Sequence, residues 1–357
     1  MKGFLKGTLA KIITAGIVAA TILTPSMTAH AAINELTGLP IRDEIALQRP
    51  IAVMIDNEVT ALNHYGVNQA DIVYEMMNST ANGRVTRLMA IVKDWGSVSM
   101  LGSIRSTRPT NVLLAAEYNA ILIHDGGPFY INDYIAKPYT NHISGGFARV
   151  ANGKNWEFTE YVTAAAYQGK KWGGGTQMYA GLASRIAASG FSTTYNAYYP
   201  GQHFTFSATP VNLGGTSANV VDMSGCFTHN KSKLLYNATT GTYDYYEYNR
   251  PHVDALNGQT TSFKNVILQC ADFLQYDPHG YMIYYLFSAN YPAGGNVGFY
   301  ATNGTTIPVY WVKGGDYDHP SPTKYYNAYT GEEIRLNPGK TYIGILPFDT
   351  WGNLRIY

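Results

Sequence analysis

The sequence contains few residues of the kinds that hold metals or act as nucleophiles. Cysteine occurs only twice in 357 residues, at Cys226 and Cys270. No Cys-x-x-Cys pair and no His-Glu-x-x-His segment is present, so the common zinc spacings are missing and we predict no bound metal. The Gly-x-Ser-x-Gly signature is also absent, which argues against an α/β-hydrolase.

Charged residues are also scarce, at 14% of the chain, and the 25 basic and 24 acidic residues nearly balance. The sequence has no run of like charges, so we expect no basic face of the kind that binds nucleic acid. Tyrosine, by contrast, is abundant, with 30 copies. Its flat ring and hydroxyl suit sugar surfaces, although strands favour aromatic residues in any case.

The first residues have the pattern of a signal peptide. Three lysines precede an uncharged apolar run over 12–24, which ends at Pro25, and the small-x-small sequence Ala29-His30-Ala31 follows. This run is shorter than the ~20 residues that span a bilayer. We therefore predict a signal peptide over 1–31 and a secreted or wall-associated, extracytoplasmic chain without a transmembrane helix. Because no cysteine lies near the cleavage site, we expect no lipid anchor.

An exported chain can have Cys226 and Cys270 either joined in a disulfide or as free thiols. In an oxidising compartment the two residues can form a disulfide that closes a long loop. A chain of this length does not need such a crosslink, so two buried free thiols are an equal alternative.

The first half of the chain alternates buried strands with helices. Apolar runs at 49–57 and 120–127 predict strands, and helical patterns occur at 108–119, with Thr107 as cap and Pro109 in the first turn, and at 177–189. Segments 85–94 and 98–104 predict a strand hairpin around Trp95-Gly96, whereas 68–77 fits either a helix or a strand. This alternation is typical of an α/β layered domain.

After His203 the helical patterns disappear, and apolar β-type runs are separated by turn sequences. The chain is longer than the usual single domain. We therefore predict an α+β protein, with an α/β domain over 32–202 that includes a linker at about 189–202. A mainly β domain would follow over 203–357.

Several segments resemble one known family. In order along the chain they are "RPIAVMIDN", "QADIVYE", "GSIRSTRP", "HDGG", "YNRPHVDALNG" and "TGEEIRLNPGKTYIGILP". Together they resemble the YerB-like family of bacterial envelope proteins, over nearly all of the chain after the signal peptide. Its members are typically two-domain lipoproteins of Gram-positive-type bacteria, and this chain departs from them by lacking the lipobox cysteine. The family has no established activity, so the resemblance implies architecture and compartment but no reaction.

The segment 105–108 has the composition of an anion site. A helix that begins there leaves unpaired backbone amides with partial positive charge. The Ser106 and Thr107 hydroxyls lie at the same point, and Arg105 and Arg108 can add bidentate contacts to phosphate or carboxylate. Arg87, inside an apolar run, is expected to join them.

Other polar residues follow strands that are expected to end at the same edge. Asp56 follows one buried strand, and His124 and Asp125 follow another. Parallel neighbouring strands would place these side chains on the rim where ligands bind in α/β sheets. Gly126 and Gly127 would allow close approach of a ligand to the backbone.

The alternative for this cluster is a buried structural network, in which the arginines pair with Asp56, Glu75 and Asp125. If it binds a ligand, the chain is an envelope protein that holds an anionic wall or phosphorylated-glycan group, or contacts another envelope protein. No cofactor is needed for this function.

Two enzymatic alternatives remain. The order of "VMIDN", "TRLMAIV" and "VSMLGSIRSTRP" is similar to that in LytR-CpsA-Psr phosphotransferases. That similarity implies Asp56 as an acid or Mg²⁺ ligand, with the three arginines on a pyrophosphate, but Leu88 and Ser106 stand where that family has acids. A hydrolase with two carboxylates among Asp56, Glu75 and Asp125 is the other alternative.

In the second half, Arg250, His252 and Asp254 form a compact polar segment. The His-x-Asp spacing can orient an imidazole or hold a metal, but two ligands are a weak signal. A structural loop in which Asp254 accepts backbone amides is the favoured interpretation.

Overall fold

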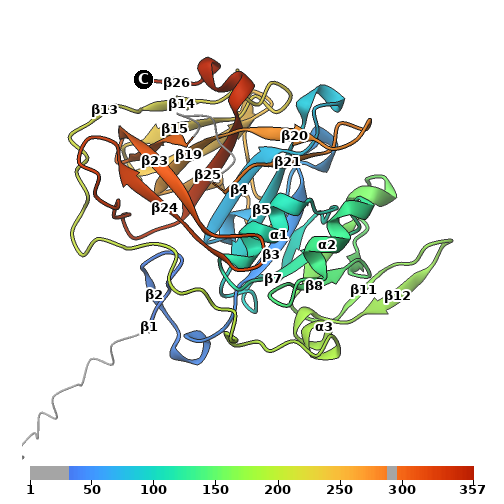
Figure 1. Cartoon of the computed structure of the whole chain (residues 1–357). Helices are drawn as coiled ribbons and strands as arrows, with labels where there is room; N and C mark the ends of the chain where they lie inside the picture. The colour runs from blue at the N-terminus through green and yellow to red at the C-terminus, as the bar shows by residue number, and fades with distance from the viewer. Residues whose placement is uncertain (1–31, 288–295) are drawn as a thin grey trace, which may run out of the picture. The chain divides into compact units, whose positions relative to one another are not determined.

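A sheet of eleven strands forms the centre of the protein (Figure 1). The computed structural model describes residues 32–287 and 296–357, and residues 32–357 make one compact unit. The predicted signal peptide lies outside the described residues. The sheet order is β13-β23-β22-β19-β25-β4-β5-β3-β7-β8, and β24 pairs with β23.

The strands of this sheet are β3 (Ile51–Asp56), β4 (Ile72–Met77), β5 (Thr86–Val92), β7 (Ile121–His124), β8 (Asn141–Ser144), β13 (Thr216–Ser217), β19 (Asn265–Ala271), β22 (Val297–Thr302), β23 (Thr305–Gly315), β24 (Pro320–Asn327) and β25 (Thr341–Pro347).

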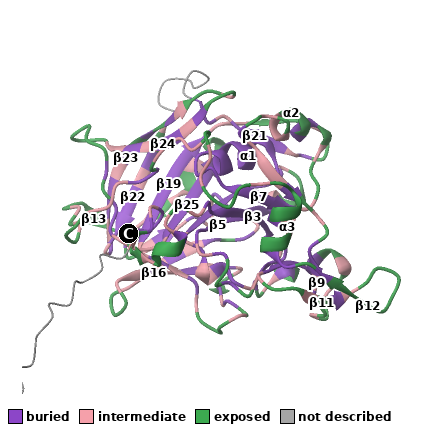
Figure 2. Ribbon diagram, turned by 90° about the horizontal axis from the view of Figure 1, so that it is seen from below, coloured by how far each residue is buried: buried purple, intermediate pink, exposed green. Residues whose placement is uncertain are grey.

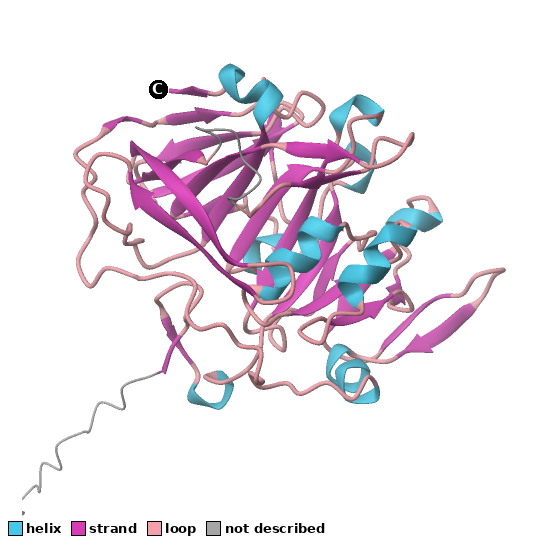
Figure 3. Cartoon of the chain, viewed as in Figure 1, coloured by secondary structure: helices cyan, strands magenta, loops and turns pink. Residues whose placement is uncertain are grey.

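Smaller sheets surround it and are formed by β1 (Ala32–Ile33) and β2 (Pro40–Ile41); β6 (Met100–Gly102), β9 (Ala148–Arg149) and β10 (Glu160–Thr163); β11 (Tyr167–Lys170) and β12 (Thr176–Tyr179); β14 (Val220–Asp222), β15 (Lys233–Asn237), β16 (Thr242–Glu247), β17 (Arg250–Pro251), β18 (Ser262–Phe263) and β26 (Arg355–Ile356); and β20 (Phe273–Gln275) and β21 (Met282–Tyr284). The α-helices are α1 (Pro109–Ala116), α2 (Asn132–Ile135) and α3 (Leu182–Ala188), and strands far outnumber them (Figure 3).

Both faces of the middle strands of the central sheet (β3, β4, β5, β19 and β25) are buried, which explains their unbroken apolar runs in the sequence. In β3, Ile51, Val53 and Ile55 join one core, and Ala52 and Met54 join the other. Helix α1 packs on the second face, because Val112, Leu113 and Leu114 belong to the same core as Met54. Buried residues are concentrated in strands such as β3, β5, β19 and β25, whereas the loop that joins β11 to β12 is exposed (Figure 2).

The predicted fold class is confirmed. The first half is a mixed α/β region, and the second half is mainly antiparallel β. Strands of both halves share the central sheet, since β25 pairs in parallel with both β4 and β19. The domain boundary near residue 202 therefore stays a prediction, because the sheet itself continues across it.

Three local predictions need correction. The predicted hairpin is wrong, because β5 pairs with β3 and β4 while β6 pairs with β10. The run from Thr86 to Val92 is buried throughout, so it occupies a central place between two long strands. Arg108, not Thr107, is the N-cap of α1. The helix predicted from residue 177 starts only at Leu182, after β12. The ambiguous segment 68–77 contains strand β4.

No helix within the described parts of the chain, 32–287 and 296–357, is long and apolar enough to cross a membrane.

Candidate functional site

The central sheet opens where β3 and β7 end. These strands are parallel neighbours as predicted, and they pair as far as Val53 and Ile123. Beyond that point the segment 103–107 lies between them. Arg105 N donates to Met54 O at 3.0 Å, and Asp125 N donates to Arg105 O at 3.0 Å. The arginine-bearing segment therefore sits at the carboxyl ends of two parallel strands, where ligands bind in such sheets.

A cavity of about 250 Å³ lies on the β3 side of this segment. It is lined by Asp56, Glu58, Asn78, Asn82, Val85, Arg87, Arg105, Ser106, Arg108 and Tyr281. Arg87 lies opposite Asp56 in the β3–β5 register, and this pairing brings the third arginine to the cavity. All three predicted arginines and Asp56 thus meet at one place.

Both carboxylate oxygens of Asp56 are already hydrogen-bonded at the wall of this cavity. Its carboxylate is almost completely buried and accepts from Arg105 Nε, while its Oδ1 accepts from Glu58 N at 2.8 Å. Burial alone would raise the pKa of Asp56, but the charges of Arg87 and Arg105 outweigh it and lower the pKa. Asp56 is therefore ionised and fixes Arg105, whose other end contacts Glu157 at 2.9 Å.

Arg87 and Arg108 are buried without a close carboxylate of their own. Both donate to the Ser106 hydroxyl, at 3.0 and 3.1 Å, and to backbone oxygens of Ser106 and Thr107. The nearest ion-pair distance for Arg87 is 4.0 Å, to Asp56. Within the described chain, the Nε atoms of Arg87 and Arg108 have no hydrogen-bond partner.

The charge state of this pair reflects its burial. Burial lowers the pKa of Arg87 to about 9, and the neighbouring guanidinium groups of Arg108 and Arg105 add to this effect. Burial also lowers the pKa of Arg108, whose guanidinium carbon lies 3.9 Å from the Tyr281 ring centroid. The cavity thus holds two cationic groups that a bound anion would stabilise.

The other predicted rim residues lie outside this cavity. Thr107 is buried, and its amide donates to Gly126 O at 3.1 Å. His124 is also buried and contacts His142 through its Nε2, at 3.0 Å. Asp125 pairs instead with Arg149 at 3.3 Å. Thr107 and the residues at the end of β7 therefore form a separate polar group across the 103–107 segment.

The two glycines after β7 do not border the cavity either. Gly126 has a φ of +74° with open space around it, a backbone conformation that glycine adopts readily. A Cβ at Gly127 would collide with the Ile131 side chain and lie 3.2 Å from Thr107 O. Gly127 therefore packs closely against Ile131 and does not approach a ligand in the cavity.

Glu75 does not line the cavity. It is fully buried on β4 and accepts hydrogen bonds from four hydroxyl groups. These belong to Thr86, Ser232, Tyr245 and Tyr342. Burial raises the pKa of Glu75. A carboxyl group enclosed in this way has no free oxygen directed at a ligand, so the structure gives no support to its pairing with Asp56 in a hydrolase.

Sequence reasoning did not find Tyr281, Asn78 or Asn82. Tyr281 precedes β21, on a hairpin far along the chain, and Asn78 N pairs with Val85 O at 3.0 Å in the turn that carries Asn82. A tyrosine in a β-rich, tyrosine-rich half carries no distinguishing local signal. Only the contact of this hairpin with the first half places Tyr281 against Arg108.

The three residues predicted as a polar segment in the second half, Arg250, His252 and Asp254, do not form one site in the structure. Asp254 accepts the amides of Gly66 at 2.9 Å and Asn68 at 2.7 Å, which is the structural role favoured above. His252 is buried and lies 2.8 Å from His64. Arg250 is exposed, and none of the three lines the cavity.

Cys226 and Cys270 are both buried free thiols. Burial raises the pKa of each to about 12, so neither is an activated nucleophile.

Comparison with known families decides the classification. The N-terminal domain of a protein family of unknown function, DUF3048, matches residues 36–173, and its C-terminal domain matches residues 221–343. The chain belongs to the DUF3048 family. The two matched segments cover most of the chain in the order expected, so the family resemblance seen in the sequence is confirmed.

A protein of known structure has the same fold. The crystal structure of YerB from Bacillus subtilis matches with a TM-score of 0.71 and 20% identity, and the match covers 91% of this chain and 99% of that one. A Bacillus subtilis protein named "Putative lipoprotein YerB" is 34% identical over 91 residues. That aligned segment spans 26% of each of the two chains.

Proposed function

We propose that this protein binds a phosphate-bearing ligand of the cell envelope, such as a phosphorylated wall glycan, in the Arg87–Arg105–Arg108 cavity. One observation carries the proposal. Arg87 and Arg108 are buried at the cavity wall, and neither makes a close ion pair with a carboxylate in the described structure.

The energetic argument starts from the cost of burying charge. A buried guanidinium without an ionised partner costs several kcal/mol, whereas charge-assisted bonds to a phosphate offset this cost. Guanidinium groups present paired donors that match phosphate oxygens. The two Nε atoms without partners add hydrogen-bond donors to this arrangement.

Aromatic residues beside the cavity favour a glycan as the rest of the ligand. Tyr276 N donates to Tyr281 O at 2.7 Å, so Tyr276 belongs to the same hairpin as Tyr281, which lines the cavity. Tyr276 stacks on Tyr130 with ring centroids 4.2 Å apart, and the adjacent Phe129 is 81% exposed. Exposed, flat aromatic faces of this kind suit sugar rings.

The proposed place of action is the extracytoplasmic envelope. The relative from Bacillus subtilis carries the word lipoprotein in its name, and the first 31 residues of this chain have a signal-peptide pattern. The absence of a cysteine near residue 31 favours secretion or wall association rather than a lipid anchor.

The geometry favours binding over phosphotransfer with Mg²⁺ at Asp56. Arg105 and the Glu58 amide already engage the two oxygens of that carboxylate. A metal would have to displace Arg105, which would remove one of the three arginines from the phosphate.

Calorimetric titration of the protein with inorganic phosphate, pyrophosphate and wall-glycan fragments tests the proposal, each with and without Mg²⁺. We expect pyrophosphate or a phosphorylated fragment to bind without Mg²⁺, and the Arg87→Met variant to bind at least tenfold more weakly. Arg42→Met is the matched control, because Arg42 is 59% exposed and pairs with Asp94 away from the cavity. No binding of any phosphate compound would overturn the proposal, and a requirement for Mg²⁺ would favour the phosphotransferase alternative.

A further inference from the structure

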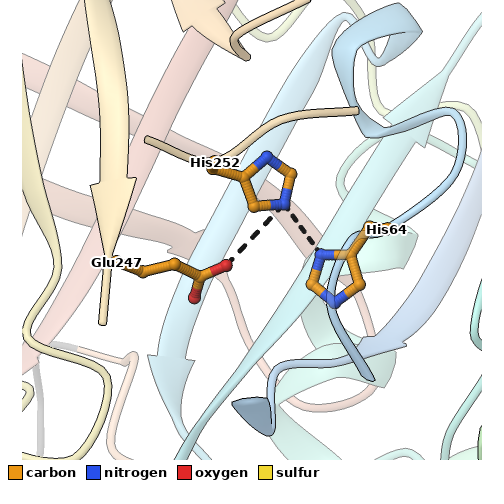
Figure 4. Close-up of side chains that lie close together, drawn as sticks. All are labelled: His64, Glu247 and His252. Carbon is orange, nitrogen blue, oxygen red and sulfur yellow. Dashed lines mark hydrogen bonds and ion pairs between the residues drawn. The ribbon is translucent and has the colours of Figure 1, made fainter. Parts of the chain in front are cut away.

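Three side chains with metal-binding atoms meet in the interior, outside the cavity described above (Figure 4). His64 lies in the loop after β3, Glu247 is the last residue of β16, and His252 follows β17. All three side chains are buried. Glu247 and His252 are close in sequence, whereas His64 lies 188 residues before His252, so no local pattern brings the three together.

The ligand atoms are spaced as a small metal site requires. His64 Nδ1 lies 2.8 Å from His252 Nε2, and His252 Nε2 lies 3.7 Å from Glu247 Oε1. The three atoms all lie within 4.8 Å of one another. A tetrahedral zinc ion with bonds of about 2.0–2.1 Å separates its ligand atoms by roughly 3.4 Å, which falls between the two distances found here.

Each imidazole is oriented by a contact behind it. His64 Nε2 lies 2.6 Å from the backbone oxygen of Asp56. A carbonyl only accepts, so this nitrogen carries the hydrogen and Nδ1 turns its lone pair toward the cluster. His252 Nδ1 lies 2.9 Å from Thr261 Oγ1. Backbone carbonyls and similar groups hold metal-binding histidines in the same manner.

The cluster also lacks positive charge. Glu247 Oε1 has no hydrogen-bond partner in the described structure. Tyr245 OH lies 3.5 Å from Glu247 Oε2 and 2.9 Å from Glu75 Oε2, so two buried carboxyl groups share one hydroxyl. Within residues 32–287 and 296–357, no lysine or arginine makes an ion pair with either carboxyl. A divalent cation would supply the missing charge.

We propose that His64, Glu247 and His252 bind a divalent transition-metal ion, with Zn²⁺ as the best match to two imidazoles and one carboxylate, and with a fourth position left for water. The ion would join the loop after β3 to β16 and the chain after β17. Because His64 also contacts the backbone of Asp56, the metal would help to fix the wall of the arginine cavity.

Metal titration of the full chain tests this site. The protein is freed of metal with a chelator, titrated with ZnCl₂, and its zinc content is measured by mass spectrometry after dialysis. We expect one tightly bound zinc per chain, a rise in Tm on zinc addition, and a visible absorption band when Co²⁺ replaces zinc.

Three variants separate this site from adventitious binding. Glu247→Gln keeps the size of the side chain and is expected to preserve the circular dichroism spectrum of the metal-free protein, while it lowers zinc affinity at least tenfold. His64→Gln should have the same effect on zinc. His142→Gln is the matched control, because His142 is also paired with a histidine, at 3.0 Å, but belongs to no cluster of three metal-binding residues in the described chain.

Two results would overturn the proposal. One is a parent protein that retains no zinc after dialysis and shows no change in Tm. The other is zinc binding that persists with the parent affinity in folded Glu247→Gln and His64→Gln.

Discussion

Replacing Arg108 with methionine separates the contribution of this arginine to ligand binding from its contribution to folding. Methionine fills a similar volume without the charge. The change removes stacking on Tyr281, at 3.9 Å, and hydrogen bonds to Ser106 and Thr107. The stacking contributes about 1 kcal/mol and each hydrogen bond also about 1 kcal/mol.

The same substitution removes a buried charge that has no close carboxylate. Apolar replacements of buried ionic groups are often neutral or stabilising by about 1–4 kcal/mol. The losses and the gain are therefore of similar size, and we expect the free energy of unfolding of Arg108→Met to remain within about 1 kcal/mol of the parent value. Arg105→Met should instead destabilise the fold by about 3–5 kcal/mol, because it leaves Asp56 buried without its main partner.

Arg108→Met should weaken ligand binding strongly, although its stability changes little. The loss of a charge-assisted contact to phosphate costs about 1.5–3 kcal/mol, which corresponds to roughly 10- to 150-fold weaker binding of pyrophosphate. Urea unfolding measures the stability of each variant, and calorimetry measures binding. If Arg108→Met unfolds as easily as Arg105→Met, or binds pyrophosphate with the parent affinity, the arginines form a structural network and the reasoning fails.

Further predictions concern the surroundings of the cavity. Burial lowers the pKa of His124 to about 4, so below pH 6.5 the folded state binds fewer protons than the unfolded state. The contribution of neutral His124 to the free energy of unfolding should therefore be complete above pH 6.5 and should fall as the pH drops toward 4. Between pH 7 and pH 5, the free energy of unfolding measured with urea should fall by about 2 kcal/mol more in the parent than in His124→Gln. An equal fall in both proteins would contradict the lowered pKa of His124. Gly127→Ala should cost about 1–3 kcal/mol in the same assay, since its Cβ collides with Ile131; a neutral result would show that the turn can relax. Thiol titration should detect neither Cys226 nor Cys270 in the native protein and both after denaturation without reductant, whereas a disulfide would leave the denatured count at zero.

Part of the candidate site was visible in the sequence because its residues lie next to strong local patterns. Asp56 ends an apolar strand, and Arg105 and Arg108 stand directly before a helix with Pro109 at its start. Such patterns place residues at the edge of a sheet. They do not show which side of the edge faces a cavity, and Asp125, predicted beside Asp56, lies across the segment 103–107 and pairs with Arg149.

The sequence alone determined the mixed α/β and β character of the two halves, because local apolar periodicity and turn residues decide it, and the resemblance of several segments pointed to the family. Tertiary structure alone decided which strands pair, as in β25 beside β4, and which distant residues meet. Tyr281 against Arg108, and His64 against Glu247 and His252, are contacts of this second kind. They depend on packing between segments far apart in the chain, where no local periodicity relates one residue to the other.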